Sequence, residues 1–225
     1  MTSDDLAQSI KAAALRLVEA AGAGGLDVES VAAADGRSSD EVGSVFGSVD
    51  ELLTALIIDA YNASGEAMER ADDPSARPGA RMLAITRALR EWSLANRAAF
   101  TLIYGSPIPG YHAPEDTVGP ASRTPAAIAR VLRSAMESGA MAQIPRPYPS
   151  PSLVTEESIA LFGGEPDPGY EDLIERGVGF WSNLVGLLVF ELFSRTHDSV
   201  TDQSAFFDYS IAAAVRGLGL TVEGA

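Results

Sequence analysis

The chain has 225 residues, of which 46% are hydrophobic, and this composition is typical of a globular protein with one or two domains. Its formal net charge of −15 argues against broad affinity for nucleic acids or for anionic membranes, because both need a positively charged protein face. The absence of cysteine excludes disulfide frameworks, thiolate zinc sites and cysteine nucleophiles.

Hydrophobic spacing predicts four helices at the start of the chain. Apolar residues recur every three or four positions in the first and the last of them. Gly22–Gly25 and Gly36 supply the residue type that ends helices, and Asp27 stands at an N-cap position. Ser38 or Ser39 is expected to cap the third helix, which is short. In chain order the predicted helices are Leu6–Ala21, Val28–Asp35, a short segment after Ser39, and Val49–Ala71.

The remaining chain is predicted to be helical except in linkers and two long proline-rich stretches. Gly105–Pro120 carries four prolines and three glycines, so it is expected to be irregular throughout. Gln143–Ser152 is a second proline-rich loop. No segment shows the alternation that is typical of a strand, so the predicted fold class is all-α. The predicted helices are about Ala80–Ala95, Ala98–Tyr104, Thr124–Ser138, Thr155–Phe162, Tyr170–Ser194 and Thr201–Leu218.

The order and spacing of the first helices resemble the helix-turn-helix end of the tetracycline-repressor (TetR) family. The resemblance rests on the segment AAGAGGLDVESVAAADGRSSDEVGSVFGSVDELLTAL, whose apolar and glycine residues fit the scaffold of that motif. The later segment FWSNLVGLLVFELF resembles the Trp-x-x-Leu-His-Gly helix of an actinobacterial branch, with Val185 in the place of the histidine. The matching positions are Leu26, Val31, Ala32, Gly36, Val42, Phe46, Leu52, Leu53, Trp181, Leu184, Gly186 and Glu191.

This resemblance implies an all-α homodimer with two domains. Residues 1–48 would form the helix-turn-helix domain, and residues 49–225 would form the ligand-binding and dimerisation domain. The last two helices carry small and apolar residues that suit a dimer face, so we expect the homodimer to form through them. No apolar run reaches the roughly 18 residues that span a bilayer, and Glu191 interrupts the nearest candidate, Leu184–Phe193. The acidic N-terminus is unlike a secretory signal, so we expect a cytoplasmic protein without a membrane partner.

The DNA-reading edge of the predicted third helix departs from the family. Gly43, Val45 and Val49 stand where the family usually has a tyrosine, a histidine and a basic residue. Residues 1–60 contain eleven acidic and three basic residues, a formal charge of −8 that opposes the phosphate neutralisation on which DNA affinity depends. We therefore expect DNA binding to be weakened or lost. If it is retained, the contacting residues are Arg37, Ser38, Ser39 and Ser44.

Two interpretations stay open for each of three acidic residues. Asp40 and Glu41 fall in the first turn of the third helix, where carboxylates also stabilise the helix dipole. They can therefore serve helix stability alone, although this does not restore affinity for DNA. Glu191 interrupts an apolar helix and is costly to bury alone, so it either faces solvent or meets an arginine or a ligand in the core.

A small-molecule pocket among the C-terminal helices is the expected binding site, because such pockets are mostly apolar with a few placed polar groups. Its candidate residues are Trp92, Tyr104, Tyr111, His112, Trp181 and Asn183. If the protein is an enzyme, the catalytic candidates are Tyr111, His112, Glu115 and Asp116. These side-chain types include groups that exchange protons near neutral pH. The alternative is an exposed loop with solvated charges, and no metal or cofactor is expected.

Three functions remain as hypotheses. The favoured one is a homodimer that binds a small organic molecule and has weakened DNA contacts. The second is a working transcriptional repressor that the ligand releases from DNA. The third is a TetR-fold enzyme that acts on a small molecule in specialised metabolism.

Overall fold

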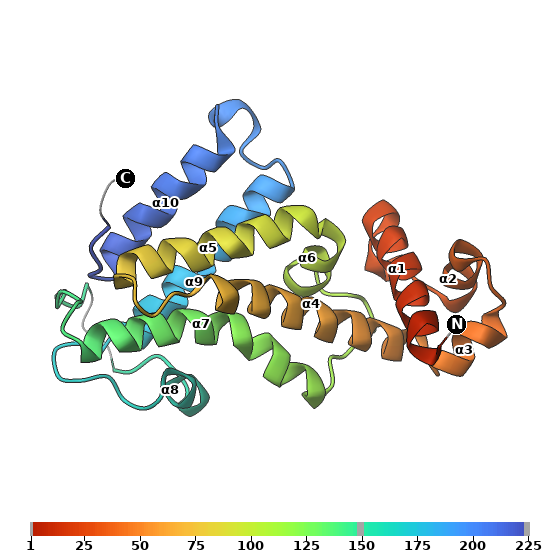
Figure 1. Ribbon diagram of the computed structural model, residues 1–225, viewed down its shortest axis with the longest axis horizontal. Helices are drawn as coiled ribbons and strands as arrows, with labels where there is room; N and C mark the ends of the chain where they lie inside the picture. The colour runs from red at the N-terminus through yellow and green to blue at the C-terminus, as the bar shows by residue number, and fades with distance from the viewer. Residues whose placement is uncertain (1, 148–150, 223–225) are drawn as a thin grey trace. The chain divides into compact units, whose positions relative to one another are not determined.

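The computed structural model describes residues 2–147 and 151–222, and helices are its regular elements (Figure 1). These residues form ten α-helices joined by loops and short 3-10 turns, without a strand, which confirms the all-α prediction. In chain order the helices are α1 (Ser3–Ala21), α2 (Val28–Asp35), α3 (Ser39–Val45), α4 (Val49–Ala71), α5 (Pro78–Ala95), α6 (Arg97–Tyr104), α7 (Val118–Glu137), α8 (Glu156–Phe162), α9 (Leu173–Leu192) and α10 (Gln203–Gly217).

Capping side chains begin the second and third helices, as the sequence predicts. The carboxylate of Asp27 accepts the backbone N–H of Ser30 at 2.7 Å and so caps α2. Gly36 ends α2 with a φ of 69°, a left-handed angle that a residue without a Cβ adopts easily. Ser38 caps α3, because its Oγ accepts the backbone N–H of Glu41 at 3.3 Å. These local bonds fix the turn between the two helices.

Helix α7 begins earlier than the sequence predicts. It starts at Val118 instead of Thr124, so the prediction that Gly105–Pro120 is irregular throughout is wrong at its C-terminal end. Pro120 falls in the first turn, where backbone N–H groups have no partner within the helix, so its missing N–H costs little. Pro120 therefore stands in the opening turn of a helix instead of preventing one, and Pro125 lies further inside α7.

The chain folds into two compact units. The first contains the residues up to Ala63 together with Ser93–Ala121, and the second contains Ser64–Trp92 and the chain from Ser122 onward. The hydrophobic core of the first unit is built from α1 to α4 and also includes Leu102 of α6. Helix α6 thus packs with the helix-turn-helix segment. The predicted domain boundary between residues 48 and 49 stays a prediction.

Nearly buried ion pairs stabilise the second unit, among them Arg90–Glu191 and Arg81–Asp72. Glu191 of α9 accepts two bonds from the guanidinium of Arg90 at 2.6 and 2.8 Å, and the two side chains are 11% and 16% exposed. Glu191 therefore meets an arginine, which is one of the two interpretations that the sequence leaves open. Arg81 binds both carboxylate oxygens of Asp72 at 2.7 and 3.0 Å, with side chains 7% and 9% exposed. Such two-pronged pairs are among the stronger polar contacts in proteins.

Helix α9 carries more apolar surface than the core of the second unit covers. By length and composition it could cross a membrane, with a mean hydropathy of 1.3, but one helix of this kind is weak evidence for a membrane span. Glu191 in the same helix is paired with Arg90. Large apolar side chains remain exposed on and beside α9 and α10, namely Val178, Phe190, Phe193, Phe206 and Tyr209. Large exposed apolar patches are typical of interaction faces.

Candidate functional site

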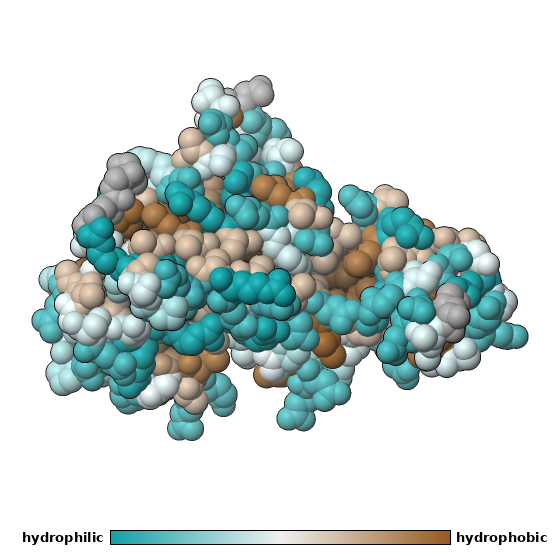
Figure 2. All heavy atoms as spheres, in the orientation of Figure 1, coloured by the Kyte–Doolittle hydropathy of each residue, from teal (hydrophilic) through white to brown (hydrophobic). Residues whose placement is uncertain are grey.

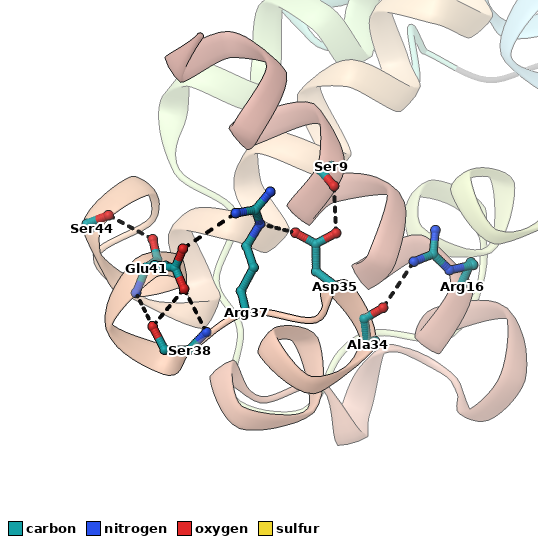
Figure 3. A network of polar contacts seen from close by, with 8 residues as sticks. All are labelled: Ser9, Arg16, Ala34, Asp35, Arg37, Ser38, Glu41 and Ser44. Atoms are coloured by element: carbon teal, nitrogen blue, oxygen red, sulfur yellow. Dashed lines mark hydrogen bonds and ion pairs between the residues drawn. The ribbon is translucent and has the colours of Figure 1, made fainter. Parts of the chain in front are cut away.

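Arg37 lies between α2 and α3, and two carboxylates hold its guanidinium (Figure 3). Its Nε donates to Oδ2 of Asp35 at 2.6 Å, and its Nη1 lies 3.5 Å from Oε1 of Glu41. The other oxygen of Asp35 accepts the hydroxyl of Ser9 at 2.6 Å. The network therefore links α1, α2 and α3, and it neutralises the cation that the sequence places at the DNA edge.

Serine hydroxyls that were predicted to contact DNA make bonds within the protein. The backbone N–H and the Oγ of Ser38 both donate to Oε2 of Glu41 at 2.9 Å. The Oγ of Ser44 donates to the carbonyl oxygen of Glu41 at 2.7 Å. Ser39, the first residue of α3, is exposed. Arg37, Ser38 and Ser44 thus stabilise the local fold, and a role in DNA contact stays a prediction for all four residues.

The same bonds keep the two carboxylates of this network ionised. The hydroxyl of Ser9, followed by the guanidinium of Arg37, holds the pKa of Asp35 below its ordinary value. The backbone N–H of Ser38, then its hydroxyl and then Arg37 lower the pKa of Glu41. Two negative charges therefore surround one positive charge at neutral pH.

Replacing Ser9 by alanine is expected to raise the pKa of Asp35 and to lower the free energy of unfolding at pH 7 by about 1 kcal/mol. The native pKa of Asp35 lies below its unfolded value, which is about 4. Its contribution to stability is therefore present above the unfolded pKa and is lost as the pH falls through the native pKa. Carbon-detected NMR titration of the carboxyl and urea unfolding at pH 7 and pH 3 measure both effects. Ser3→Ala at the exposed start of α1 is the control. An unchanged pKa of Asp35 in Ser9→Ala would contradict this account.

The other two basic residues of the helix-turn-helix segment also have partners inside the protein. Nζ of Lys11 lies 2.8 Å from Oδ2 of Asp59. Nη2 of Arg16 donates to the carbonyl oxygen of Ala34 at 3.3 Å. Phosphate would therefore have to compete with existing contacts for each of these cations.

Two predicted ligand residues, Tyr104 and Tyr111, belong to the first unit. The ring of Tyr104 packs against Phe100 and Tyr61, with ring centroids 5.1 and 6.2 Å apart. The hydroxyl of Tyr111 lies 2.9 Å from Oγ1 of Thr54, and its ring packs against the core of the helix-turn-helix segment. These contacts account for both tyrosines as packing residues, and their role in ligand binding stays a prediction.

The neighbours of Tyr111 in the same loop are exposed. The side chain of His112 is in solvent, and Glu115 and Asp116 are exposed in a 3-10 turn, Glu115–Thr117. The Tyr111 hydroxyl is directed to Thr54 of α4 by its hydrogen bond. This is the arrangement of an exposed loop with solvated charges, one of the alternatives considered for this stretch. The catalytic role of its residues stays a prediction.

A cavity of about 240 Å³ lies within the second unit, between α7, α8 and α9. Trp181 lines it, together with Leu132 of α7 and Phe162 of α8. Among the eleven described residues around it, none has an ionisable side chain, and Ser158 supplies a hydroxyl. Its volume is just below the roughly 300–1,000 Å³ of pockets for drug-sized ligands. The cavity therefore suits a small and largely apolar molecule.

Trp181 is the predicted ligand residue that the structure places at this cavity. Asn183 is exposed and lines a different, open groove of about 560 Å³ along α9 and α10. Trp92 is half-buried on α5. The sequence did not predict the residues of α7 and α8 that line the cavity, including Ile128, Ala129 and Leu161. The only signal for them is the apolar face of α7, which has the same pattern as ordinary core packing.

Sequence comparison connects the chain to known regulators. Residues 82–214 match a family described as Tetracyclin repressor-like, C-terminal domain. The chain is 34% identical over 191 residues to the HTH-type transcriptional regulator Rv1816 of Mycobacterium tuberculosis (strain H37Rv). The alignment covers 83% of this chain and 81% of Rv1816. It has the same identity and coverage with the HTH-type transcriptional regulator Mb1846 of Mycobacterium bovis.

Solved structures show the same fold. The regulatory protein SCO4313 matches with a TM-score of 0.73 and 26% identity, over 95% of this chain and 97% of that chain. A regulatory protein of the tetR family from Rhodococcus RHA1 matches with a TM-score of 0.69, over 96% of this chain and 98% of that chain. Its identity is 17%, so this likeness concerns the fold alone.

Proposed function

We propose that this chain, which belongs to the tetracycline repressor (TetR) family of transcriptional regulators, is a homodimer that binds a small organic molecule among its C-terminal helices and has weakened or lost DNA binding. The relatives named as transcriptional regulators favour a soluble, cytoplasmic protein. The proposal includes no cofactor and no metal.

The main observation in support of weakened DNA binding is that carboxylates within the protein neutralise Arg37. Its guanidinium is shared between Asp35 and Glu41, so two carboxylates offset its charge and a phosphate would compete with them for it. Asp40 and Glu41 on α3, and Asp50 and Glu51 in the first turn of α4, are exposed. In the family these segments approach DNA, and four carboxylates there oppose the counterion release that drives such binding.

The cavity beside Trp181 supports the binding of a small molecule. It lies between three helices of the second unit and is lined mainly by apolar side chains. Preformed apolar cavities with few polar groups are the usual form of small-molecule sites.

The exposed apolar side chains of α9 and α10 support the homodimer. Phe190 is 53% exposed and Tyr209 is 73% exposed, a costly arrangement for large side chains in water. Gly186 on α9 and Ala213 on α10 are small residues that allow close packing between helices. A second copy that presents the same helices would cover this apolar surface.

A working, ligand-released repressor is the second candidate. The names of the relatives at 34% identity favour it, because both are described as HTH-type transcriptional regulators. The buried scaffold of the helix-turn-helix also persists, with Val42 1% exposed and Phe46 9% exposed. The two candidates differ in one property, which is the affinity of the N-terminal segment for DNA.

Sedimentation velocity of the full chain with fluorescent DNA from its own upstream region tests the proposal. At about 50 mM salt, where electrostatic binding is least screened, we expect a dimer that leaves the DNA free. Co-sedimentation of the DNA that is reversed by higher salt or by a small molecule would support the repressor instead. A monomer at micromolar concentration would contradict the dimer.

A further inference from the structure

We propose that the cavity between α7, α8 and α9 binds a small uncharged molecule with one ring and one hydroxyl-sized polar group, and that α8 is a lid latched by Arg133. This inference rests on the proposed function, because it assigns a ligand class and an entry route to the small-molecule site. All the residues that it uses belong to the second unit.

The lining of the cavity selects against charge. Its walls consist of aliphatic and aromatic side chains, with the Ser158 hydroxyl and the Trp181 indole as the polar contributions from side chains. A charged group held against these walls would lose hydration without a charged side chain among the lining residues to replace it. Oγ of Ser158 lies 3.4 Å from Oγ1 of Thr155, at the long limit of a hydrogen bond. The Ser158 hydroxyl can therefore turn to bond a ligand oxygen at little cost.

The volume of the cavity is sufficient for about one ring. Its 240 Å³ is roughly the space that eight water molecules take up in the liquid. An apolar cavity of about 150 Å³ in another protein suffices to bind benzene. The additional space admits a short substituent on such a ring.

Helix α8 has the properties of a movable cover. It has only seven residues, so it is too short to be stable without tertiary contacts. Gly163 and Gly164 follow it with φ angles of 96° and 113°, which residues with a Cβ rarely adopt. Leu161 is 40% exposed, and Figure 2 shows apolar surface beside polar residues in the region of α8. The position of α8 is therefore set by a small number of contacts.

Arg133 of α7 provides the contacts that hold the end of α8. Its Nη1 donates to the carbonyl oxygen of Gly163 at 2.8 Å, and its guanidinium carbon lies 5.5 Å from the centroid of the Phe162 ring. Its Nε donates to Oε1 of Glu137 at 2.7 Å, which orients the guanidinium. Phe162 is 5% exposed and lines the cavity. Arg133 thus fixes both the last turn of the lid and the ring that closes the site.

NMR spectra of the full-length protein, in which each tryptophan indole N–H gives one signal, test the ligand class. The chain has two tryptophans, and a Trp92→Phe variant assigns the signal of Trp181. Benzyl alcohol is expected to shift the Trp181 signal with a dissociation constant of about 1 mM or lower. Benzoate, which has a similar size and a charge, is expected to bind at least about tenfold more weakly. Equal binding of benzoate would overturn the assignment of an uncharged ligand.

A cavity-filling variant tests the location. Ala129→Leu fills part of the cavity with little loss of helix propensity and is expected to weaken the binding of benzyl alcohol at least about tenfold. Ala160→Leu on the exposed side of α8 is expected to bind as the wild type does. Unchanged binding in Ala129→Leu, or a shift of Trp92 alone, would overturn the location while leaving the proposed function intact. If benzyl alcohol shifts neither tryptophan signal, the location is likewise overturned. The proposed loss of DNA binding is tested separately by sedimentation.

Hydrogen exchange tests the latch. Arg133→Met keeps the stem of the side chain and removes the guanidinium, so the amides of α8 are expected to exchange at least about tenfold faster. Arg130→Met, which removes an exposed arginine from the same helix, is expected to leave exchange in α8 unchanged. Equal exchange in the two variants would overturn the role of Arg133 as a latch.

Discussion

Replacing Arg81 by alanine is expected to lower the free energy of unfolding by about 3–5 kcal/mol. The carboxylate of Asp72, only 9% exposed, would lose two bonds of 2.7 and 3.0 Å and remain as an unpaired charge. The bond from Arg81 to Oγ of Ser134 at 3.2 Å would be lost as well. Urea unfolding followed by circular dichroism at constant protein concentration measures the effect.

Arg87 provides a matched control for Arg81. It also binds a carboxylate at two points, that of Asp208, at 2.8 and 3.0 Å. Its side chain and that of Asp208 are 50% and 41% exposed, so water can replace the lost contact. Arg87→Ala is therefore expected to cost less than about 1 kcal/mol. Equal losses in the two variants would show that burial does not make the Arg81 pair special.

Rebuilding the DNA edge is expected to raise DNA affinity about tenfold for each phosphate contact at about 50 mM salt. The double variant Asp40→Lys, Val49→Lys removes one exposed carboxylate from α3 and places cations at the starts of α3 and α4. Two new contacts would steepen the slope of log affinity against log salt by about 1.8. Fluorescence anisotropy with a labelled duplex at several salt concentrations measures both quantities.

The same change in charge elsewhere is the control for the rebuilt edge. Glu165→Lys with Ala140→Lys alters the net charge by the same amount at exposed positions of the second unit. This variant is expected to change affinity much less, because its cations lie outside the segment that resembles a DNA reader. If both variants gain affinity equally, net charge and not the α3 edge limits binding.

Helix starts that depend on a capping side chain are predicted correctly from the sequence, whereas the helix start inside the proline-rich segment is not. Asp27 is confirmed as a cap, and of the two serines predicted for α3 it is Ser38 that caps the helix, because a cap depends on residues within three positions of it. The start of α7 at Val118 was missed, because prolines are tolerated in a first turn although they disfavour the helix interior. Residue types alone did not separate these two uses of proline.

The candidate sites depend on contacts between distant segments, which one sequence does not contain. Glu191 is paired with Arg90, 101 positions away, and the sequence only limits its partner to solvent, an arginine or a ligand. Trp181 was selected for its family position, but its cavity partners on α7 and α8 have the pattern of core residues. The lack of basic residues on α3 is visible in the sequence. The ion pair between Arg37 and Asp35 is visible only in the folded turn.

The salt dependence of wild-type binding to DNA from its own upstream region tests the central claim most directly. With cations held in intramolecular pairs and carboxylates exposed on α3, we expect no saturable binding by anisotropy at about 50 mM salt. Saturable binding at about 150 mM salt, with a slope as steep as that of a protein making six or more phosphate contacts, would contradict the account.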